Sequence, residues 1–171
     1  WYVPKIIKKQ KVNTLKVQLN KIYIKLLSNM KLKNNIFVHR DFHVSNLMKV
    51  KKNIGVIDAQ DALYGNIAYD LASLVDDVRI KTSNKLKEKI FLEFIRSNKK
   101  VDANKLKNDF EILSVLRNLK IIGIFTRLSI RDKKHNYLKL IPHVWKLIEY
   151  RINKNFKFEE LKFVLDKYFP K

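Results

Sequence analysis

Apolar residues recur along most of the chain at intervals of three or four positions, the spacing that places them on one face of a helix. The clearest run predicts an amphipathic helix over about 12–30. Its apolar positions are Leu15, Leu19, Ile22, Leu26 and Met30. Further helices are expected over about 70–78, 83–97, 105–130, 135–152 and 157–168. The chain has only three Gly and three Pro, which agrees with a mainly helical structure.

Three short apolar runs depart from this spacing. Ile36–Val38 is expected to form a buried strand. Leu47–Val50 and Ile54–Ile57 are expected to pair as a hairpin, with the polar residues between them as the turn. The stretch 59–66 is expected to be a loop, in which Gly65 is a candidate for a positive φ angle. The predicted fold class is therefore α+β and mainly helical, with a small β-hairpin.

Length and composition favour a single domain over residues 1–171. The chain is 46% hydrophobic, which is enough for one core, and it is too short for two ordinary domains. It contains no apolar run of about 18 residues, so no transmembrane helix is expected. The first residues, Trp1 to Lys11, lack the order of a signal peptide. The absence of Cys excludes disulfides and thiolate metal sites, and we expect a cytoplasmic protein.

The net charge of +21 raises the alternative of a basic module that binds nucleic acid or an anionic membrane. The basic residues comprise 30 Lys and 7 Arg, whereas specific readers of phosphates and bases depend more on the Arg fork. The Lys residues are also scattered among Asn and Ile, which is typical of compositional bias. We therefore expect no specific nucleic-acid partner and no membrane partner, although weak attraction to a polyanion remains open.

One stretch of the chain is free of positive charge. From Ile54 to Val78 there is no Lys or Arg, and the stretch holds five aspartates. They are Asp58, Asp61, Asp70, Asp76 and Asp77. In a chain this basic, such a window indicates carboxylates with a task, for example holding a cation. Chance together with helix capping is the alternative, and the pair Asp76 and Asp77 is interpreted as a solvated helix end.

A polar segment after the first predicted strand carries the pattern His-x-Asp-x4-Asn, formed by His39, Asp41 and Asn46. Asp58 ends the hairpin, which can bring it beside Asn46. Phosphoryl transfer needs a carboxylate that orients the attacking hydroxyl and accepts its proton, the role we predict for Asp41. Magnesium needs hard oxygen ligands, which Asn46 and Asp58 could supply. The alternatives are turn or cap roles for Asp41 and Asn46, and a strand-boundary role for Asp58.

A resemblance to a known family is carried by two segments, Val38–Met48 (VHRDFHVSNLM) and Val56–Gly65 (VIDAQDALYG). They resemble the catalytic segment of the aminoglycoside phosphotransferase/choline kinase family, which shares the protein-kinase fold. Within it they are similar to the bacterial anomeric sugar kinases that phosphorylate N-acetylmuramate and N-acetylglucosamine at C1 during cell-wall recycling. The resemblance implies the C-terminal lobe of a protein-kinase-like fold, with ATP and Mg²⁺ as cofactors.

The resemblance also implies a role for each matching residue. Asp41 would be the catalytic base, while Asn46 and Asp58 would bind magnesium. His39 and Asp70 would brace the loop, His39 by packing and Asp70 through backbone amides. Candidate substrate contacts are Asp61, His43 and Arg127.

The chain departs from this family in two respects. Ala59 follows the metal-binding Asp58 where a large residue is expected, which predicts a packing void. No Gly-rich loop is present, so the N-terminal nucleotide-binding lobe is expected to be absent from residues 1–171 and to be supplied in cis or in trans. A truncated or degenerate, non-catalytic kinase-like binding module is therefore the alternative to an active sugar kinase. The acceptor stays open, since an aminoglycoside, a choline-like alcohol or homoserine would suit the same fold.

Overall fold

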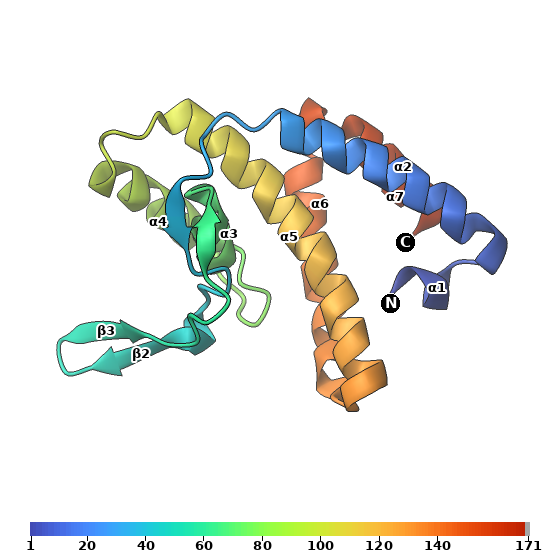
Figure 1. Cartoon of the computed structure of the whole chain (residues 1–171), viewed down its shortest axis with the longest axis horizontal. Helices are drawn as coiled ribbons and strands as arrows, with labels where there is room; N and C mark the ends of the chain where they lie inside the picture. The colour runs from blue at the N-terminus through green and yellow to red at the C-terminus, as the bar shows by residue number, and fades with distance from the viewer. Residues whose placement is uncertain (170–171) are drawn as a thin grey trace. The chain divides into compact units, whose positions relative to one another are not determined.

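Helices carry most of the chain in the computed structural model, which describes residues 1–169 (Figure 1). The described residues divide into two compact units. The terminal unit combines Trp1–Asn29 with the chain from Val115 onward, and the central unit is Met30–Ser114. No helix within residues 1–169 is long and apolar enough to cross a membrane.

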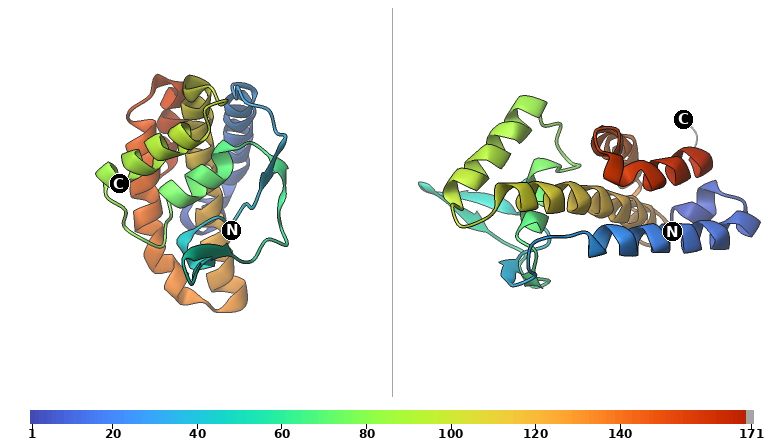
Figure 2. Two further views of the ribbon diagram at one scale, coloured as in Figure 1. Left: turned by 90° about the vertical axis from the view of Figure 1, so that its left-hand side faces the viewer. Right: turned by 90° about the horizontal axis from the view of Figure 1, so that it is seen from above.

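The terminal unit consists of helices. They are α1 (Val3–Ile6), α2 (Lys9–Ser28), the later part of α5 (Ala103–Asp132), the 3₁₀ turn η2 (His135–Leu140), α6 (Ile141–Ile152), the 3₁₀ turn η3 (Phe156–Phe158) and α7 (Glu159–Tyr168). Helix α7 packs against both α2 and α6 (Figure 2). Pro142 lies in the first turn of α6, where its missing N–H leaves no helical hydrogen bond unmade. The helix expected over 135–152 is thus divided, because its first six residues form the 3₁₀ turn η2 and the α-helix begins only at Ile141.

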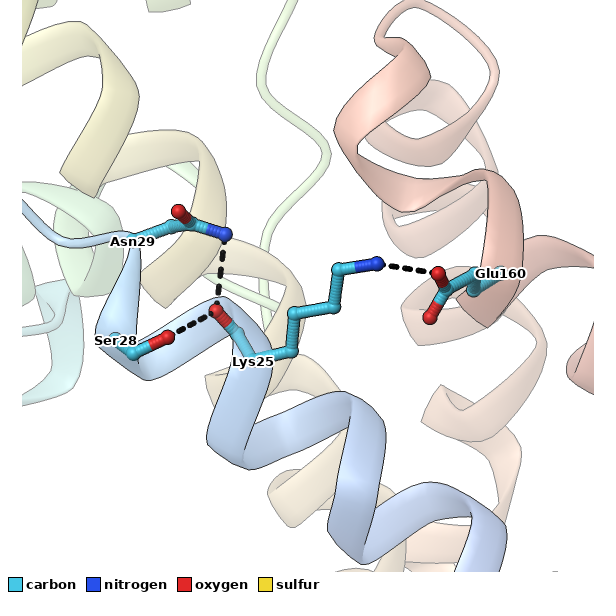
Figure 3. A network of polar contacts seen from close by, with 4 residues as sticks. All are labelled: Lys25, Ser28, Asn29 and Glu160. Carbon is cyan, nitrogen blue, oxygen red and sulfur yellow. Dashed lines mark hydrogen bonds and ion pairs between the residues drawn. The ribbon is translucent and has the colours of Figure 1, made fainter.

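Helix α2 confirms the amphipathic pattern of the sequence. Leu15, Ile22 and Leu26 are buried on one face. The last turn is closed by the Lys25 carbonyl, which accepts hydrogen bonds from Ser28 Oγ at 2.9 Å and Asn29 Nδ2 at 3.0 Å (Figure 3). Lys25 Nζ also pairs with Glu160 of α7. Both side chains of this pair are exposed, so it contributes less than about 1 kcal/mol to stability.

Tyr23 of α2 gives a pH-dependence that can be tested. Burial raises its pKa to about 12, because the phenolate is poorly solvated there. The folded state therefore favours the neutral Tyr23. Its contribution to the free energy of unfolding is complete below pH 10, the ordinary tyrosine pKa, and is lost as the pH rises through 12. An absorbance titration of the seven tyrosines should therefore show one group ionising last, and Tyr23→Phe should remove that step. Ionisation of all tyrosines together near pH 10 would contradict the burial of Tyr23.

The central unit has two small antiparallel sheets and the helices beside them. Its elements are β1 (Ile36–Val38), the 3₁₀ turn η1 (Val44–Asn46), β2 (Leu47–Val50), β3 (Asn53–Val56), β4 (Leu63–Gly65), α3 (Ala68–Val75), α4 (Asn84–Ser97) and the first part of α5. Strands β2 and β3 form a hairpin that extends away from the helices of this unit (Figure 1). Its register pairs Leu47 with Val56 and Val50 with Asn53. The expected strand 36–38 and the expected hairpin both form. The strand was expected to be buried, which is confirmed for Val38 only, because Ile36 and Phe37 are exposed.

The core of the central unit lies between α3, α4 and α5. The buried residues are Ala68, Leu71, Ala72, Val75, Leu106, Phe110 and Leu113. Phe91 of α4 packs on Phe110, with ring centroids 5.0 Å apart. Helix α4 begins where the sequence predicts, because Ser83 Oγ accepts the Leu86 amide at 3.3 Å. This core holds α3 in place, and Asp70 of α3 contacts the segment between β1 and β2 that carries Asp41 and Asn46.

Asp109 of α5 fixes the beginning of α3. Its fully buried carboxylate accepts the backbone amides of Lys31 and Leu32, each at 2.8 Å, and Asn66 Nδ2 at 2.7 Å. Asn66 Oδ1 in turn accepts the Ala68 amide at 2.9 Å. Because a buried carboxylate is costly unless its oxygens are hydrogen-bonded, this arrangement has one well-satisfied geometry. The start of α3 is therefore held at a defined position relative to α5.

Two predictions for residues 59–66 are wrong. This stretch contains β4, which pairs with β1 in the register Ile36 to Gly65 and Val38 to Leu63. Gly65 does not have a positive φ, and among the described residues no glycine does. A Cβ at Gly65 would lie 3.1 Å from Val38 Cγ2, so a side chain there would push the Val38 side chain aside by a few tenths of an ångström.

Candidate active site

The segment between β1 and β2 begins with a buried histidine. His39 is 4% exposed, and its Nε2 donates to the carbonyl of Ile57 at 2.9 Å. A carbonyl can only accept, so Nε2 carries the proton. The ring also makes an edge contact with Phe42, with centroids 6.1 Å apart. His39 therefore lies where a packing residue would, tying this segment to the end of β3.

Asp70 of α3 accepts two backbone hydrogen bonds from the same segment. Its Oδ2 accepts the His39 amide at 2.7 Å and its Oδ1 accepts the Arg40 amide at 3.0 Å. Arg40 has φ 73°, a left-handed conformation that costs a non-glycine residue free energy. The charge-assisted hydrogen bonds that these two amides donate to Asp70 offset that cost. The backbone immediately before Asp41 is thus fixed in a conformation it would not adopt by itself.

Asp41 and Asn46 are joined through the Asp41 main chain. The Asp41 carbonyl accepts the His43 amide at 2.9 Å and Asn46 Nδ2 at 3.0 Å. Asn46 is 9% exposed, and its own carbonyl accepts the Ile57 amide at 3.1 Å. The side-chain nitrogen of Asn46 is therefore engaged, which leaves its Oδ1 as the atom suited to a cation. The Asp41 carboxylate takes no part in these contacts.

Asp58 reaches the same region through the hairpin. The pairing of Leu47 with Val56, continued by the bond between Asn46 and Ile57, places Asp58 one residue beyond the position opposite Asn46. Asp58 has φ 69°, a left-handed conformation like that of Arg40. Its side chain is exposed, and its Oδ1 accepts Gln60 Nε2 at 2.7 Å.

The donor set fits a magnesium ion that a nucleotide would help to hold. Within residues 1–169 no group of three or more His, Cys, Asp or Glu side chains could hold a metal by itself. Asn46 Oδ1 and the Asp58 carboxylate are hard oxygen donors, and Mg²⁺ in phosphotransfer sites is commonly bound by one or two carboxylates plus substrate phosphates. The exposed Asp58 leaves room for those phosphates. Two protein ligands would be too few for a closed structural metal site, and they suit an open one.

The remaining candidates lie in different surroundings. Asp61 is exposed, and its carbonyl accepts Arg40 Nη1 at 3.1 Å. His43 is 6% exposed within the segment that follows Asp41. Arg127 belongs to the terminal unit, where its Nε is buried without a hydrogen-bond partner among the described residues. Ala59 is exposed, so the absence of a larger side chain leaves no buried void at this position.

Asp76 and Asp77 were expected to be solvated, and this expectation is wrong. Each is 1% exposed. Asp76 pairs with Lys87 Nζ at 2.7 Å and accepts Ser114 Oγ at 2.5 Å. Asp77 Oδ2 accepts the Val44 amide at 3.2 Å, within the segment that carries Asp41 and Asn46. Asp77 lies beyond the end of α3, and its partner Val44 is 33 residues away in the chain, so no local pattern in the sequence indicated this contact.

Comparison with known proteins places the chain in a family. Residues 8–96 match the phosphotransferase enzyme family. The chain is 38% identical over 113 residues to the N-acetylmuramate/N-acetylglucosamine kinase of Neisseria meningitidis serogroup B, covering 63% of this chain and 34% of that protein. It is 29% identical over 140 residues to the kinase of the same name from Caulobacter vibrioides, covering 79% and 38%. It is 27% identical over 167 residues to that of Pseudomonas putida, covering 94% and 49%.

The chain therefore belongs to the phosphotransferase enzyme family. The resemblance seen in the sequence is confirmed, including the similarity to proteins named as N-acetylmuramate/N-acetylglucosamine kinases. The chain spans between a third and a half of the length of these curated relatives.

Proposed function

We propose that the chain is the C-terminal lobe of an ATP-dependent kinase that phosphorylates a hydroxyl group of a small molecule. The proposed acceptor is the C1 hydroxyl of an amino sugar such as N-acetylmuramate or N-acetylglucosamine. The names of the relatives support these sugars as the substrate class. The observation that carries the proposal is the joint placement of Asp41, Asn46 and Asp58, since these three supply the groups that phosphoryl transfer requires. An N-terminal lobe, in cis or in trans, would complete the nucleotide site, and a cytoplasmic location remains a prediction.

In this proposal Asp41 is the catalytic base. Its carboxylate orients the sugar hydroxyl and accepts the proton as the oxygen forms its bond to the terminal phosphorus of ATP, while the bond to ADP breaks. Asn46 Oδ1 and the Asp58 carboxylate would hold Mg²⁺, which supplies charge neutralisation on the phosphates when bound. His39 and Asp70 act through the backbone and keep Asp41 in place. Asp61, His43 and Arg127 remain candidate substrate contacts.

The test is calorimetric titration of the chain with ATP in the presence and absence of magnesium. We expect binding that depends on magnesium and that weakens by at least about tenfold in Asp58→Ala, because that variant loses a charged ligand. Asp166→Ala is the matched control, since it also removes one exposed carboxylate but lies on α7. Equal binding by Asp58→Ala and wild type would contradict the metal role of Asp58. No magnesium-dependent binding would mean either that the nucleotide site needs the N-terminal lobe or that the chain is a non-catalytic kinase-like module, and repeating the titration with that lobe present would distinguish the two.

A further inference from the structure

A second carboxylate holds the segment that carries Asp41 and Asn46. Asp70 accepts the amides of His39 and Arg40, before Asp41, and Asp77 accepts the amide of Val44, after it. We propose that Asp77 is a positioning residue that fixes the turn bearing Asn46, and thereby the magnesium ligand. The proposal rests on the proposed function, which it extends by a residue outside the His-x-Asp-x4-Asn pattern.

The environment of Asp77 calls for a carboxylate. Its side chain is inaccessible to solvent, and a buried charge is costly unless it is paired and hydrogen-bonded. Oδ2 accepts the Val44 amide, whereas Oδ1 accepts the Arg79 amide at 3.0 Å and lies 3.5 Å from the Arg79 guanidinium. All of these partners are donors. A carboxylate presents only acceptors, whereas an Asn side chain would turn N–H groups toward one of them.

The contact with Val44 is transmitted directly to Asn46. Val44 is the first residue of η1, so its amide has no partner inside that turn. The turn continues with the Asn46 amide donating to the His43 carbonyl at 2.9 Å. Asn46 Nδ2 then donates to the Asp41 carbonyl at 3.0 Å. Holding the Val44 amide therefore holds the turn whose last residue presents Oδ1 to the proposed metal.

The end of α3 provides a firm base for Asp77. The neighbouring Asp76 is bonded to Lys87 of α4 and to Ser114 of α5, and all three residues are buried. At the other end of the same helix, Asp109 and Asn66 fix the start. Helix α3 is thus held at both ends. From it, Asp70 holds the backbone before Asp41, and Asp77, just beyond its end, holds the backbone after Asp41.

The test measures loop order and metal affinity separately. Residue-resolved amide hydrogen exchange would be recorded for wild type, Asp77→Ala, Asp77→Asn and Asp70→Asn, with Mn²⁺ titrated as the metal probe. For Asp77→Ala we expect exchange at Val44 and Asn46 to rise by about tenfold or more, because a charge-assisted hydrogen bond is lost, while His39 and Arg40 stay protected. Mn²⁺ affinity should fall by about tenfold to a hundredfold, as for other partners that orient metal ligands. Asp70→Asn should show the converse exchange pattern.

Asp77→Asn keeps the side-chain volume and one acceptor, so it decides the question if Asp77→Ala does not fold. Its exchange at Val44 should lie between those of wild type and Asp77→Ala. The matched control is Asp102→Ala, because Asp102 also accepts two backbone amides, those of Asn104 and Lys105, but at the start of α5. It should change neither the exchange of the segment nor Mn²⁺ affinity.

The outcomes separate this proposal from the one on which it rests. Unchanged exchange at Val44, or raised exchange with unchanged Mn²⁺ affinity, would overturn the positioning role of Asp77 while the metal site stands. Two other results would count against the proposed function: no Mn²⁺ binding by wild type, or Mn²⁺ binding that Asp58→Ala does not weaken. In either case the metal assignment fails, and the positioning role of Asp77 fails with it.

Discussion

Replacing Asp41 by Asn is expected to lower phosphoryl transfer by about 10²- to 10⁴-fold, the usual contribution of a positioned proton acceptor. The structural contacts of this residue should survive, because the Asp41 carbonyl rather than its carboxylate accepts His43 N and Asn46 Nδ2. The loss should therefore appear in kcat, with the apparent affinity for ATP and the melting temperature close to wild type. Sugar-dependent ADP release, measured with the N-terminal lobe present, gives the rate.

Asp166→Asn serves as the control, since it neutralises an exposed carboxylate on α7 of the terminal unit. It should retain the wild-type rate. If Asp41→Asn kept most of its activity while Asp166→Asn behaved normally, Asp41 could not be the proton acceptor. The phosphotransferase family would still hold, and the base would have to be sought among other residues.

The local elements of the fold could be predicted because their signals are local. The period of the apolar positions defines α2 and α4, and the Ser83 cap marks where α4 begins. Strand β1 and the β2–β3 hairpin follow from short apolar runs separated by a polar turn. Such patterns need only neighbouring residues, so a single sequence contains the information.

The errors concern contacts between distant parts of the chain. Strand β4 has three residues and pairs with β1, so nothing in its own sequence distinguishes it from a loop. Gly65 was interpreted through φ, whereas the constraint comes from Val38 on the facing strand. The burial of Asp76 likewise depends on Ser114, 38 residues further along the chain. A charged pair following a short helix is usually exposed, and only the tertiary structure reverses that expectation.

The aspartates between Ile54 and Val78 divide into distinct tasks. Asp58 is the proposed metal ligand, and Asp61 remains a candidate substrate contact. Asp70 and Asp77 accept backbone amides of the segment around Asp41, and Asp76 forms a buried ion pair. The sequence window thus correctly indicated that these carboxylates make specific contacts. Two of them, Asp70 and Asp77, hold the backbone around Asp41.

The buried pair Lys87–Asp76 should have the largest effect on stability. Its side chains are 9% and 1% exposed, and Lys87→Met would remove the ammonium group that pairs with the buried Asp76 carboxylate. We expect a loss of about 3–5 kcal/mol in the free energy of unfolding, measured from urea denaturation midpoints. That is a large fraction of the ~5–15 kcal/mol that stabilises a typical domain.

Two comparisons isolate burial as the cause. The double variant Lys87→Met/Asp76→Asn removes both charges, so it should recover most of the loss, because no unpaired charge remains and Asn can still accept from Ser114. Lys25→Met breaks the pair with Glu160, whose side chains are 61% and 58% exposed, and should cost less than about 1 kcal/mol (Figure 3). Similar losses from Lys87→Met and Lys25→Met would show that Lys87 and Asp76 are solvated. In that case α3 would lack the firm end from which Asp77 reaches Val44.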